Sequence, residues 1–434
     1  MEFGKYITKG IWGLADKALP VVYGVGYVWL VIRVLPEEEF GNFVLVQEVF
    51  LVISGLATAF ALQPLLKFSS EQNARLEGIV SASLILNALF IALASLVVAA
   101  CSAPAGRMFN SPPLGPLLLY VPAMLAASFF RNFTLTLLQA QFRIREVFWT
   151  DAVHFVGTPF LVWVMSRLHM FGSALDLVMI NLVSLSASSL AGLWCARKLM
   201  RVRVRPPSDA MRQMWDYGKY SLGGVISSLF STKADSFILS AFTGPVQVAV
   251  YNSAKVFVRL YEMAAQVVQM FILPAASRLS SGGSFLSLKA MTEKSILFLT
   301  LGLLPVTVLF LAFPEILVRV LYAGRYAEAV PILRIFSFLT FVVPIAAVGS
   351  NVLMGLGEAR LSFILGIQVL VASLGAFILC IPPWGAVGAG TGYLAASAAT
   401  SMLTARLLVR HVPLTAAAII GRTKDIRTFI KSRF

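Results

Sequence analysis

Five polar side chains fall on one side of an otherwise apolar helix predicted over residues 248–272. They are Lys255, Arg259, Glu262, Gln266 and Gln269. Their spacing of i, i+4, i+7, i+11 and i+14 aligns them along one face of an α-helix. Such a face cannot lie against hydrocarbon, so it indicates the wall of a water-filled cavity that binds a polar ligand. The alternative is a face satisfied by neighbouring helices, with Arg259 and Glu262 paired one turn apart.

Other charged residues also interrupt apolar segments. They are Asp16, Lys17, Arg131, Asp151, Lys233 and Asp235. Charges at such positions are costly and therefore usually face a bundle interior or a wet cavity. We take Asp16, Asp235 and Glu262, with Gln266 and Gln269, as candidates for a polar cavity lining or for ion coupling. Asp151 and His154 have the i, i+3 spacing of a proton relay, although this spacing more often reflects a structural hydrogen bond near a helix end.

The composition places these residues in a membrane protein. Hydrophobic residues make up 58% of the 434 residues and charged residues 13%, and the mean hydropathy is +0.84. A soluble domain contains roughly 25% charged residues, so this chain lacks the polar groups to cover itself in water. A soluble enzyme, a secreted disulfide scaffold and a nucleic-acid-binding domain are excluded. The three cysteines lie in or beside apolar runs and indicate packing rather than a metal or redox site.

A helix needs about 20 mainly apolar residues to cross a bilayer. The sequence contains twelve such runs, at 10–33, 43–66, 78–101, 115–138, 148–168, 174–196, 215–241, 248–272, 294–320, 330–355, 361–381 and 386–409. It therefore predicts an all-α membrane protein with twelve transmembrane helices and short connections. The sequence contains no GxxxxGK[ST] loop, so ATP hydrolysis by that motif is not expected. Coupling to a proton or sodium gradient remains open, and we expect no cofactor.

The net charge of +15 reports the orientation of the chain rather than its ligand. Most Lys and Arg residues fall in the connections on the side of the N-terminus, and few fall on the other side. Basic residues concentrate in cytoplasmic loops, so both termini are predicted to be cytoplasmic. The acidic and basic residues balance in the other loops and within the spans. The excess charge therefore lies where topology alone requires it.

The longest basic connection, about 197–213, divides the chain into two sets of six predicted helices. Gly41-Asn42-Phe43 opens the second helix as Ala249-Val250-Tyr251 opens the eighth, and Pro116 starts the fourth as Pro331 starts the tenth. This nearly constant offset predicts two lobes, 1–205 and 206–434, related by pseudo-two-fold symmetry about the membrane normal. Within the twelfth helix, Gly388, Gly392 and Ala396 form a ridge that permits close packing of another helix.

Several short motifs resemble the bacterial polysaccharide flippases, which belong to the multidrug, oligosaccharidyl-lipid and polysaccharide exporter superfamily. The motifs lie at Lys9–Gly13, Arg33–Phe43, Ala249–Tyr251, Asn351–Arg360 and Gly385–Ala396. The chain departs from the family at Ala249, where a glycine is usual. The resemblance covers essentially the whole chain, but each motif is short.

The resemblance implies an alternating-access flippase and no enzyme activity. It would move a polyprenyl-pyrophosphate-linked oligosaccharide across the bacterial inner membrane for the synthesis of cell-surface polysaccharides such as O-antigen. A pyrophosphate in the membrane requires cationic partners, and the candidates are Lys17, Arg131, Lys233, Lys255 and Arg259. The implied partners are the lipid-linked substrate, membrane lipids and the polysaccharide polymerase machinery, without nucleic acid and without a metal.

Three other functions compete with this one. A multidrug or organic-cation antiporter of the same superfamily would use the cavity acids Asp16, Asp235 and Glu262. A peptidoglycan lipid-precursor flippase usually has two further helices, for which this chain has no remaining apolar run. A membrane glycosyltransferase or polymerase would need a large outer loop, and the predicted connections on that side are short.

Overall fold

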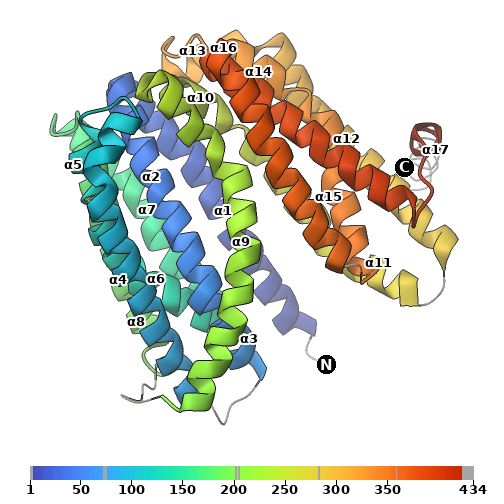
Figure 1. Cartoon of the computed structure of the whole chain (residues 1–434), viewed down its shortest axis with the longest axis horizontal. Coiled ribbons are helices and arrows are strands. Elements are labelled where there is room, and N and C mark those ends of the chain that lie inside the picture. The colour runs from blue at the N-terminus through green and yellow to red at the C-terminus, as the bar shows by residue number, and fades with distance from the viewer. Residues whose placement is uncertain are drawn as a thin grey trace. The chain divides into compact units, whose positions relative to one another are not determined.

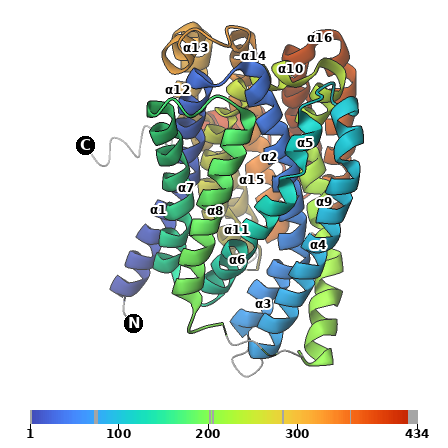
Figure 2. The same cartoon turned by 90° about the vertical axis from the view of Figure 1, so that its left-hand side faces the viewer.

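A computed structural model describes residues 3–71, 76–200, 203, 206–281, 284–357 and 359–422, and the regular structure in these ranges is helical (Figures 1 and 2). The prediction of an all-α protein is confirmed. Helices are expected here because hydrocarbon offers no hydrogen bonds to the backbone, and a helix satisfies its own amides.

Residue contacts divide the chain into two compact units, Met1–Ala249 and Val250–Phe434. The helices of the first unit are α1 (Phe3–Val34), α2 (Glu37–Ala57), the π-helical turn η1 (Thr58–Leu62), α3 (Gln63–Glu71), α4 (Leu76–Met108), α5 (Leu114–Leu118), α6 (Val121–Ala140), α7 (Ile144–Arg167), α8 (Ala174–Ala196) and α9 (Ser208–Thr243). Helix α10 (Pro245–Lys255) runs from the first unit into the second. There follow α11 (Val258–Ser281), α12 (Phe285–Ala312), α13 (Pro314–Tyr322), α14 (Ala329–Phe336), α15 (Leu339–Gly355), α16 (Ala359–Val409) and α17 (Ala416–Gly421).

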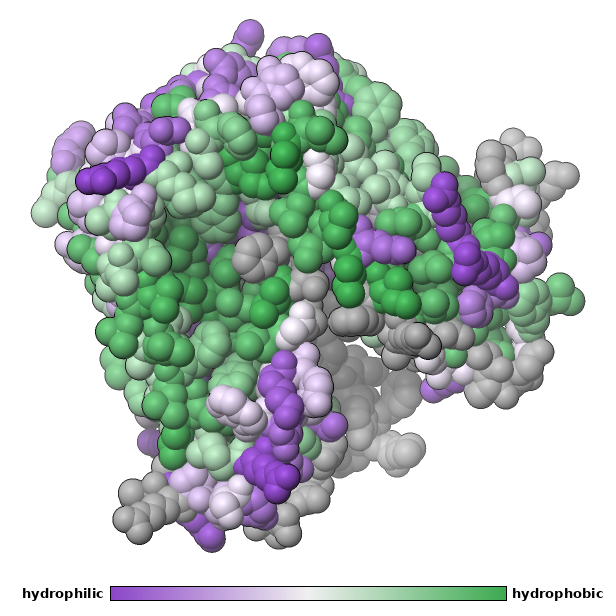
Figure 3. Space-filling model, viewed as in Figure 1, coloured by the Kyte–Doolittle hydropathy of each residue, from purple (hydrophilic) through white to green (hydrophobic). Residues whose placement is uncertain are grey.

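Each of the twelve predicted spans lies on one or more of these helices. Within the described ranges, seven helices are long and apolar enough to cross a membrane, and α14 with α15, bent by 48°, forms an eighth candidate. The multi-pass prediction is thus confirmed, whereas the number twelve and the side of the termini remain predictions. Leu89, Leu93 and Leu96 form an exposed face of α4, and Figure 3 shows a largely apolar flank on the first unit.

Helix α16 contains two helices that reverse direction at Gly385. Pro382 and Pro383 cannot donate backbone hydrogen bonds, and Gly385 adopts a left-handed φ of 53° that favours glycine. Beyond the turn, Gly388 lies against the backbone of Cys380 and Gly392 lies against Phe377. These contacts run in antiparallel order. They confirm the predicted role of the small-residue ridge for Gly388 and Gly392.

Helix α9 packs on α2, η1, α3 and α4 and therefore belongs to the first unit by contact. The predicted lobe boundary at 205/206 assigns the same helix to the second repeat. That boundary concerns the internal repeat, and it remains a prediction. By its contacts, α9, which is the seventh predicted span, therefore packs with helices of the first unit.

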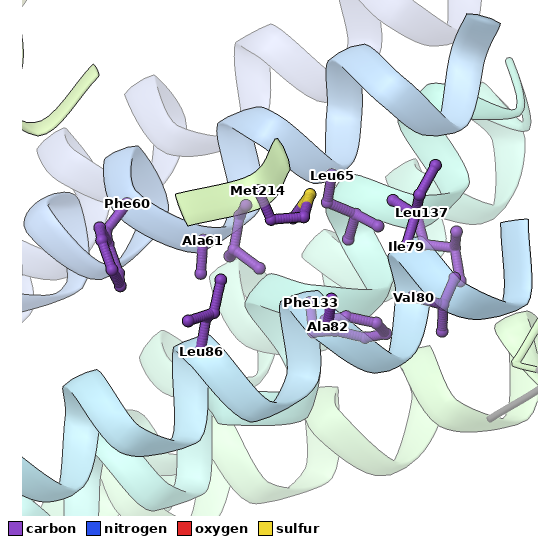
Figure 4. Packing of buried hydrophobic residues seen from close by; sticks show 11 residues of the cluster. Phe60, Ala61, Leu65, Ile79, Val80, Ala82, Leu86, Phe133, Leu137 and Met214 are labelled. Atoms are coloured by element: carbon purple, nitrogen blue, oxygen red, sulfur yellow. The ribbon is translucent and has the colours of Figure 1, made fainter. Parts of the chain in front are cut away.

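The core of the first unit forms around the π-helical turn. Its buried residues come from α2–η1–α3, α4, α6 and α9, and Figure 4 shows them pointing toward one another. They are Phe60, Ala61, Leu62, Leu65, Ile79, Val80, Ala82, Leu86, Phe133, Leu137 and Met214. Gly218 of α9 lies against the carbonyl of Phe60, where a Cβ atom would overlap the oxygen. A glycine at this point lets α9 approach the turn closely.

We expect the substitution Gly388→Ala to destabilise the α16 reversal, because its new methyl group would overlap the Cys380 carbonyl. Overpacking of this kind costs about 1–3 kcal/mol and should lower the midpoint of thermal unfolding by several degrees in detergent. Gly375→Ala is the matched control, since a Cβ atom there meets nothing within 4 Å. Equal midpoints for the two variants would contradict this account.

Candidate functional site

The predicted polar face is present on α11, and most of it is exposed. Arg259, Glu262, Gln266 and Gln269 are exposed, and Lys255 is half-buried. The prediction of one continuous helix over 248–272 is wrong at Val256–Phe257, where a turn separates α10 from α11. The Phe257 and Leu260 amides there make tighter i to i+3 hydrogen bonds of 3.1 Å. Residues 248–272 contain no Pro or Gly from which this break in the helix could be predicted.

The exposure of this face bears on its two interpretations. The four polar side chains from Arg259 to Gln269 are exposed, so packing against neighbouring helices does not bury them. A charged and amide-bearing face in a membrane span avoids lipid. That this face forms the wall of a water-filled cavity stays a prediction.

Lys255 lies against an aromatic platform in the second unit. Its Nζ atom is 5.4 Å from the ring centroid of Tyr251 and 5.9 Å from that of Tyr393. Phe336 packs against both rings, at 6.3 Å and 5.7 Å between centroids. Cation–π attraction of about 0.5–2 kcal/mol per pair steadies the ammonium group while leaving its charge in place. Three helices, α10, α14 and α16, contribute to this platform.

Arg131 of α6 is engaged within the first unit. Its guanidinium forms an ion pair with Asp151 of α7, and its Nε donates a hydrogen bond of 3.1 Å to Ser188 of α8. Both partners of the ion pair are largely buried, with side chains 12% and 13% exposed. A buried pair of this kind needs additional hydrogen bonds to offset desolvation. Arg131 thereby ties three helices together, and its contact with a substrate stays a prediction.

His154 takes part in a separate set of hydrogen bonds. Its Nδ1 lies 3.1 Å from the Ser184 hydroxyl, and Thr158 donates to Ser184 at 2.7 Å. Asp151 instead binds Arg131. The structure thus favours the structural interpretation of the Asp151–His154 spacing over the proton relay.

Asp16 lies near this network on α1. Its side chain is 7% exposed, and its Oδ1 accepts no hydrogen bond from the described residues. It lies close enough to Arg131 to interact electrostatically with the guanidinium. The structure therefore brings together Asp16 and Arg131 among the predicted residues. The side chain of Lys17 lies outside the described residues.

Lys233 of α9 is paired with a residue that the sequence did not single out as a site. Its Nζ lies 2.7 Å from Oε2 of Glu48 on α2. The Glu48 carboxylate is buried. Lys233 compensates this buried charge, so substrate binding by Lys233 stays a prediction. The sequence signal for this ion pair was the presence of two opposite charges, each in an apolar segment. The two residues are far apart in the sequence, so their spacing could not show that they pair.

Asp235, two residues beyond Lys233, is fully buried and accepts a 2.7 Å hydrogen bond from the backbone amide of Ser236. The candidate residues therefore fall into distinct groups: Asp16 with Arg131, Lys233 with Glu48, and Lys255 with the exposed face of α11. Among the described residues, no cluster of three or more His, Cys, Asp or Glu side chains is arranged to hold a metal ion.

A family model described as "Polysaccharide biosynthesis protein" matches residues 30–331, more than half of the chain. The chain belongs to this family. An uncharacterized membrane protein of Methanocaldococcus jannaschii is 30% identical over 195 residues, which cover 44% of this chain and 38% of that relative's length.

Two solved structures are similar over nearly the whole fold. One is an inward-facing multidrug resistance MATE family transporter of the MOP superfamily, with a TM-score of 0.76, 14% identity, and coverage of 92% of this chain and 98% of that one. The other is the lipid II flippase MurJ in an inward closed conformation, with a TM-score of 0.72, 12% identity, and coverage of 95% and 89%. The resemblance to polysaccharide flippases is confirmed for family and fold. The family model describes a role in polysaccharide biosynthesis, and the two solved structures show the fold.

Reversing one charge of the Lys233–Glu48 pair should destabilise the protein, and reversing both should restore most of its stability. Glu48→Lys places two cations in a buried position, and breaking such a pair costs about 3–5 kcal/mol. We expect a lower unfolding midpoint for Glu48→Lys and recovery of most of the loss in Glu48→Lys/Lys233→Glu. The control is Lys219→Glu, which disrupts an exposed pair with Asp216 and should have little effect. A double variant as unstable as Glu48→Lys would show that the pair does not act as a unit.

Proposed function

We propose that the chain is a flippase that moves a polyprenyl-pyrophosphate-linked oligosaccharide between the two leaflets of a bacterial inner membrane. The observation that carries the proposal is the exposed polar face of α11, which begins at Arg259 and follows the half-buried Lys255 at the end of α10. Membership of the polysaccharide biosynthesis family and a fold shared with a lipid II flippase support it. This flipping step would supply the synthesis of a cell-surface polysaccharide such as O-antigen or lipopolysaccharide.

The chemistry of the substrate explains the residue types on this face. A pyrophosphate loses much of its hydration on entering a membrane protein, and cations must replace that hydration. Arg259 offers a planar group for bidentate binding, and Lys255 offers a compact charge steadied by Tyr251 and Tyr393. Gln266 and Gln269 supply donors and acceptors for sugar hydroxyls farther along the same face. The lipid chain would remain in the bilayer while the head group crosses.

Alternating access would expose this face first to the cytoplasm and then to the outer side. Membrane lipids are partners throughout, and the polymerase machinery that receives the glycan is a further proposed partner. The driving force is assigned to a proton or sodium gradient acting at Asp16. This carboxylate is buried beside Arg131 and has an oxygen without a hydrogen-bond donor among the described residues.

Removal of both cations should abolish flipping. Charge-assisted hydrogen bonds contribute about 1.5–3 kcal/mol each, so Lys255→Ala/Arg259→Ala, which removes two cations, should reduce the rate at least about a hundredfold. The assay follows a fluorescent polyprenyl-pyrophosphate glycan across the bilayer of vesicles that contain the purified chain. Arg212→Ala/Lys219→Ala removes two exposed cations of α9 and should leave the rate unchanged.

An unchanged rate in the Lys255/Arg259 variant would remove this face from the mechanism. The same vesicles test the rival function, because an organic-cation antiporter would transport a cationic dye and ignore the glycan. Glu262, exposed on the same face, would then be the binding residue.

Coupling at Asp16 predicts a loss of response to the ion gradient. In wild-type vesicles, an imposed proton or sodium gradient should accelerate flipping, whereas Asp16→Asn should flip at one rate with and without it. The amide keeps the size of the side chain but cannot ionise. Glu38→Gln, at an exposed position in the first turn of α2, is the control. A gradient response that survives in Asp16→Asn would place the coupling elsewhere.

A further inference from the structure

Two exposed side chains of α3 lean across a seam onto α9 in the first unit. Helix α3 packs beside the N-terminal half of α9, as Figure 1 shows. The Gln63 Oε1 atom accepts a hydrogen bond from the Ser221 hydroxyl of α9. The Lys67 Nζ atom lies 4.7 Å from the ring centroid of Tyr217, which is also on α9. These four residues form the α3–α9 seam.

The backbone around the seam holds it in place. Gln63 directly follows the π-helical turn, and Gly218 of α9 lies against the Phe60 carbonyl of that turn. A Cβ atom at position 218 would overlap this oxygen, so only glycine permits the approach. The side chains of the seam therefore extend from backbones that are in direct contact. Groups arranged in advance in this way lose less freedom when they bind a ligand.

Two aromatic rings hold the ammonium group of Lys67. Its Nζ atom lies 5.3 Å from the ring centroid of Phe68 and 4.7 Å from that of Tyr217. The two rings meet edge to face, with 5.6 Å between their centroids. Cation–π attraction orients the ammonium group and leaves its charge in place. Because Lys67 is also exposed, its ammonium group is accessible to an anion. Lys255 is held by two rings in the same way in the second unit.

Gln63 adds a second exposed donor on the same face of α3. Gln63 and Lys67 are four residues apart, so their Cβ atoms are separated by about 5–6 Å. The Ser221 hydroxyl occupies the carbonyl oxygen of Gln63, so its NH2 group is the part that donates to a ligand. A pyrophosphate presents oxygens on two linked phosphorus atoms and can accept from both donors at once.

The seam lies at the end of a membrane span. The apolar segment formed by α2, η1 and α3 runs over Glu37–Ser69. At a rise of 1.5 Å per residue, Lys67 lies about 3 Å and Gln63 about 9 Å before its end. Hydrocarbon gives way to polar head groups at the ends of such a span. The phosphate groups of a membrane lipid therefore lie at the depth of the seam before the lipid enters the protein.

We infer that the α3–α9 seam is a loading site, where Lys67 and Gln63 bind the pyrophosphate of the lipid-linked substrate before its head group crosses. This inference rests on the proposed function and adds a second anion site to the polar face of α11. A phospholipid shares the anionic chemistry, but its single phosphodiester offers fewer oxygens to two separate donors. A free pyrophosphate lacks the chain that brings the lipid-linked one to this depth.

The test measures binding of a fluorescent polyprenyl pyrophosphate to the purified full chain in detergent, by fluorescence anisotropy. The background is Lys255→Ala/Arg259→Ala, which lacks the cations of the other site and should still bind the lipid at the seam. Adding Lys67→Met should weaken this binding about tenfold, because a charge-assisted hydrogen bond is lost. Methionine keeps a flexible side chain that packs on aromatic rings. Lys67→Arg, which keeps the charge, should retain most of the affinity.

Lys219→Met in the same background is the matched control. Lys219 of α9 is also exposed and also lies over a ring, 5.2 Å from the centroid of Tyr220, but its charge is paired with Asp216. Its loss should leave the affinity unchanged. All of these variants change exposed positions, so they should unfold at similar temperatures without lipid. That measurement separates a lost ligand contact from a folding defect.

Two competitors identify the source of the anion. An excess of phosphatidylglycerol should displace little of the fluorescent lipid, and inorganic pyrophosphate should compete more weakly than unlabelled polyprenyl pyrophosphate. Tighter binding of phosphatidylglycerol would assign the seam to a bilayer lipid, and tighter binding of inorganic pyrophosphate would assign it to the free anion. Either result would overturn the loading site.

The remaining outcomes separate this inference from the proposed function. If the Lys255→Ala/Arg259→Ala background bound no lipid, or if Lys67→Met left its affinity unchanged, the loading site would be overturned while the proposed function stood. A wild-type chain that bound no polyprenyl pyrophosphate would overturn both.

Discussion

Hydrocarbon cannot solvate a charge, and this constraint acts on the ionisable side chains of membrane-spanning helices. A buried charge is stable only beside an opposite charge and hydrogen-bond donors. Arg131 with Asp151, and Lys233 with Glu48, satisfy this condition within the first unit. The charges of α11 do not become buried at all. The first arrangement holds helices together, and the second leaves polar chemistry available to a ligand.

The same constraint explains how the helices are joined. Lipid tails are as apolar as leucine, so close van der Waals contact, rather than the exclusion of water, holds helices together in a membrane. Gly388 brings the two helices of α16 to backbone contact, and Gly218 brings α9 against the π-helical turn. The polar groups can be held in fixed positions because these backbones approach so closely.

The sequence predicted features that depend on composition and local spacing. Apolar runs located the helices, and the i, i+4 ridge at Gly388 and Gly392 identified a close packing surface. The polar face from Arg259 to Gln269 was also predicted, because helical periodicity fixes it.

Contacts between segments that are distant in the sequence could not be predicted from composition and local spacing. Arg131 and Asp151 lie on different helices, and only packing decides that Asp151 faces the arginine rather than His154. The burial of Glu48 likewise depends on the position of α9. The turn at Val256–Phe257 has neither proline nor glycine, so no residue type marked it.

The π-helical turn Thr58–Leu62 has a consequence for single-residue deletions and for sequence alignment. The Gln63 amide bonds to the Thr58 carbonyl, so the helix accommodates one residue more than an α-helix would in the same turn. Loss of a single codon here would convert the turn to α-helix without breaking it. The side chains of α3 would then keep their orientation relative to α2, because the residue removed is the extra one that the π-helical turn holds. Homologues that differ by one residue at this point need a gap in their alignment, or inward positions will be compared with outward ones.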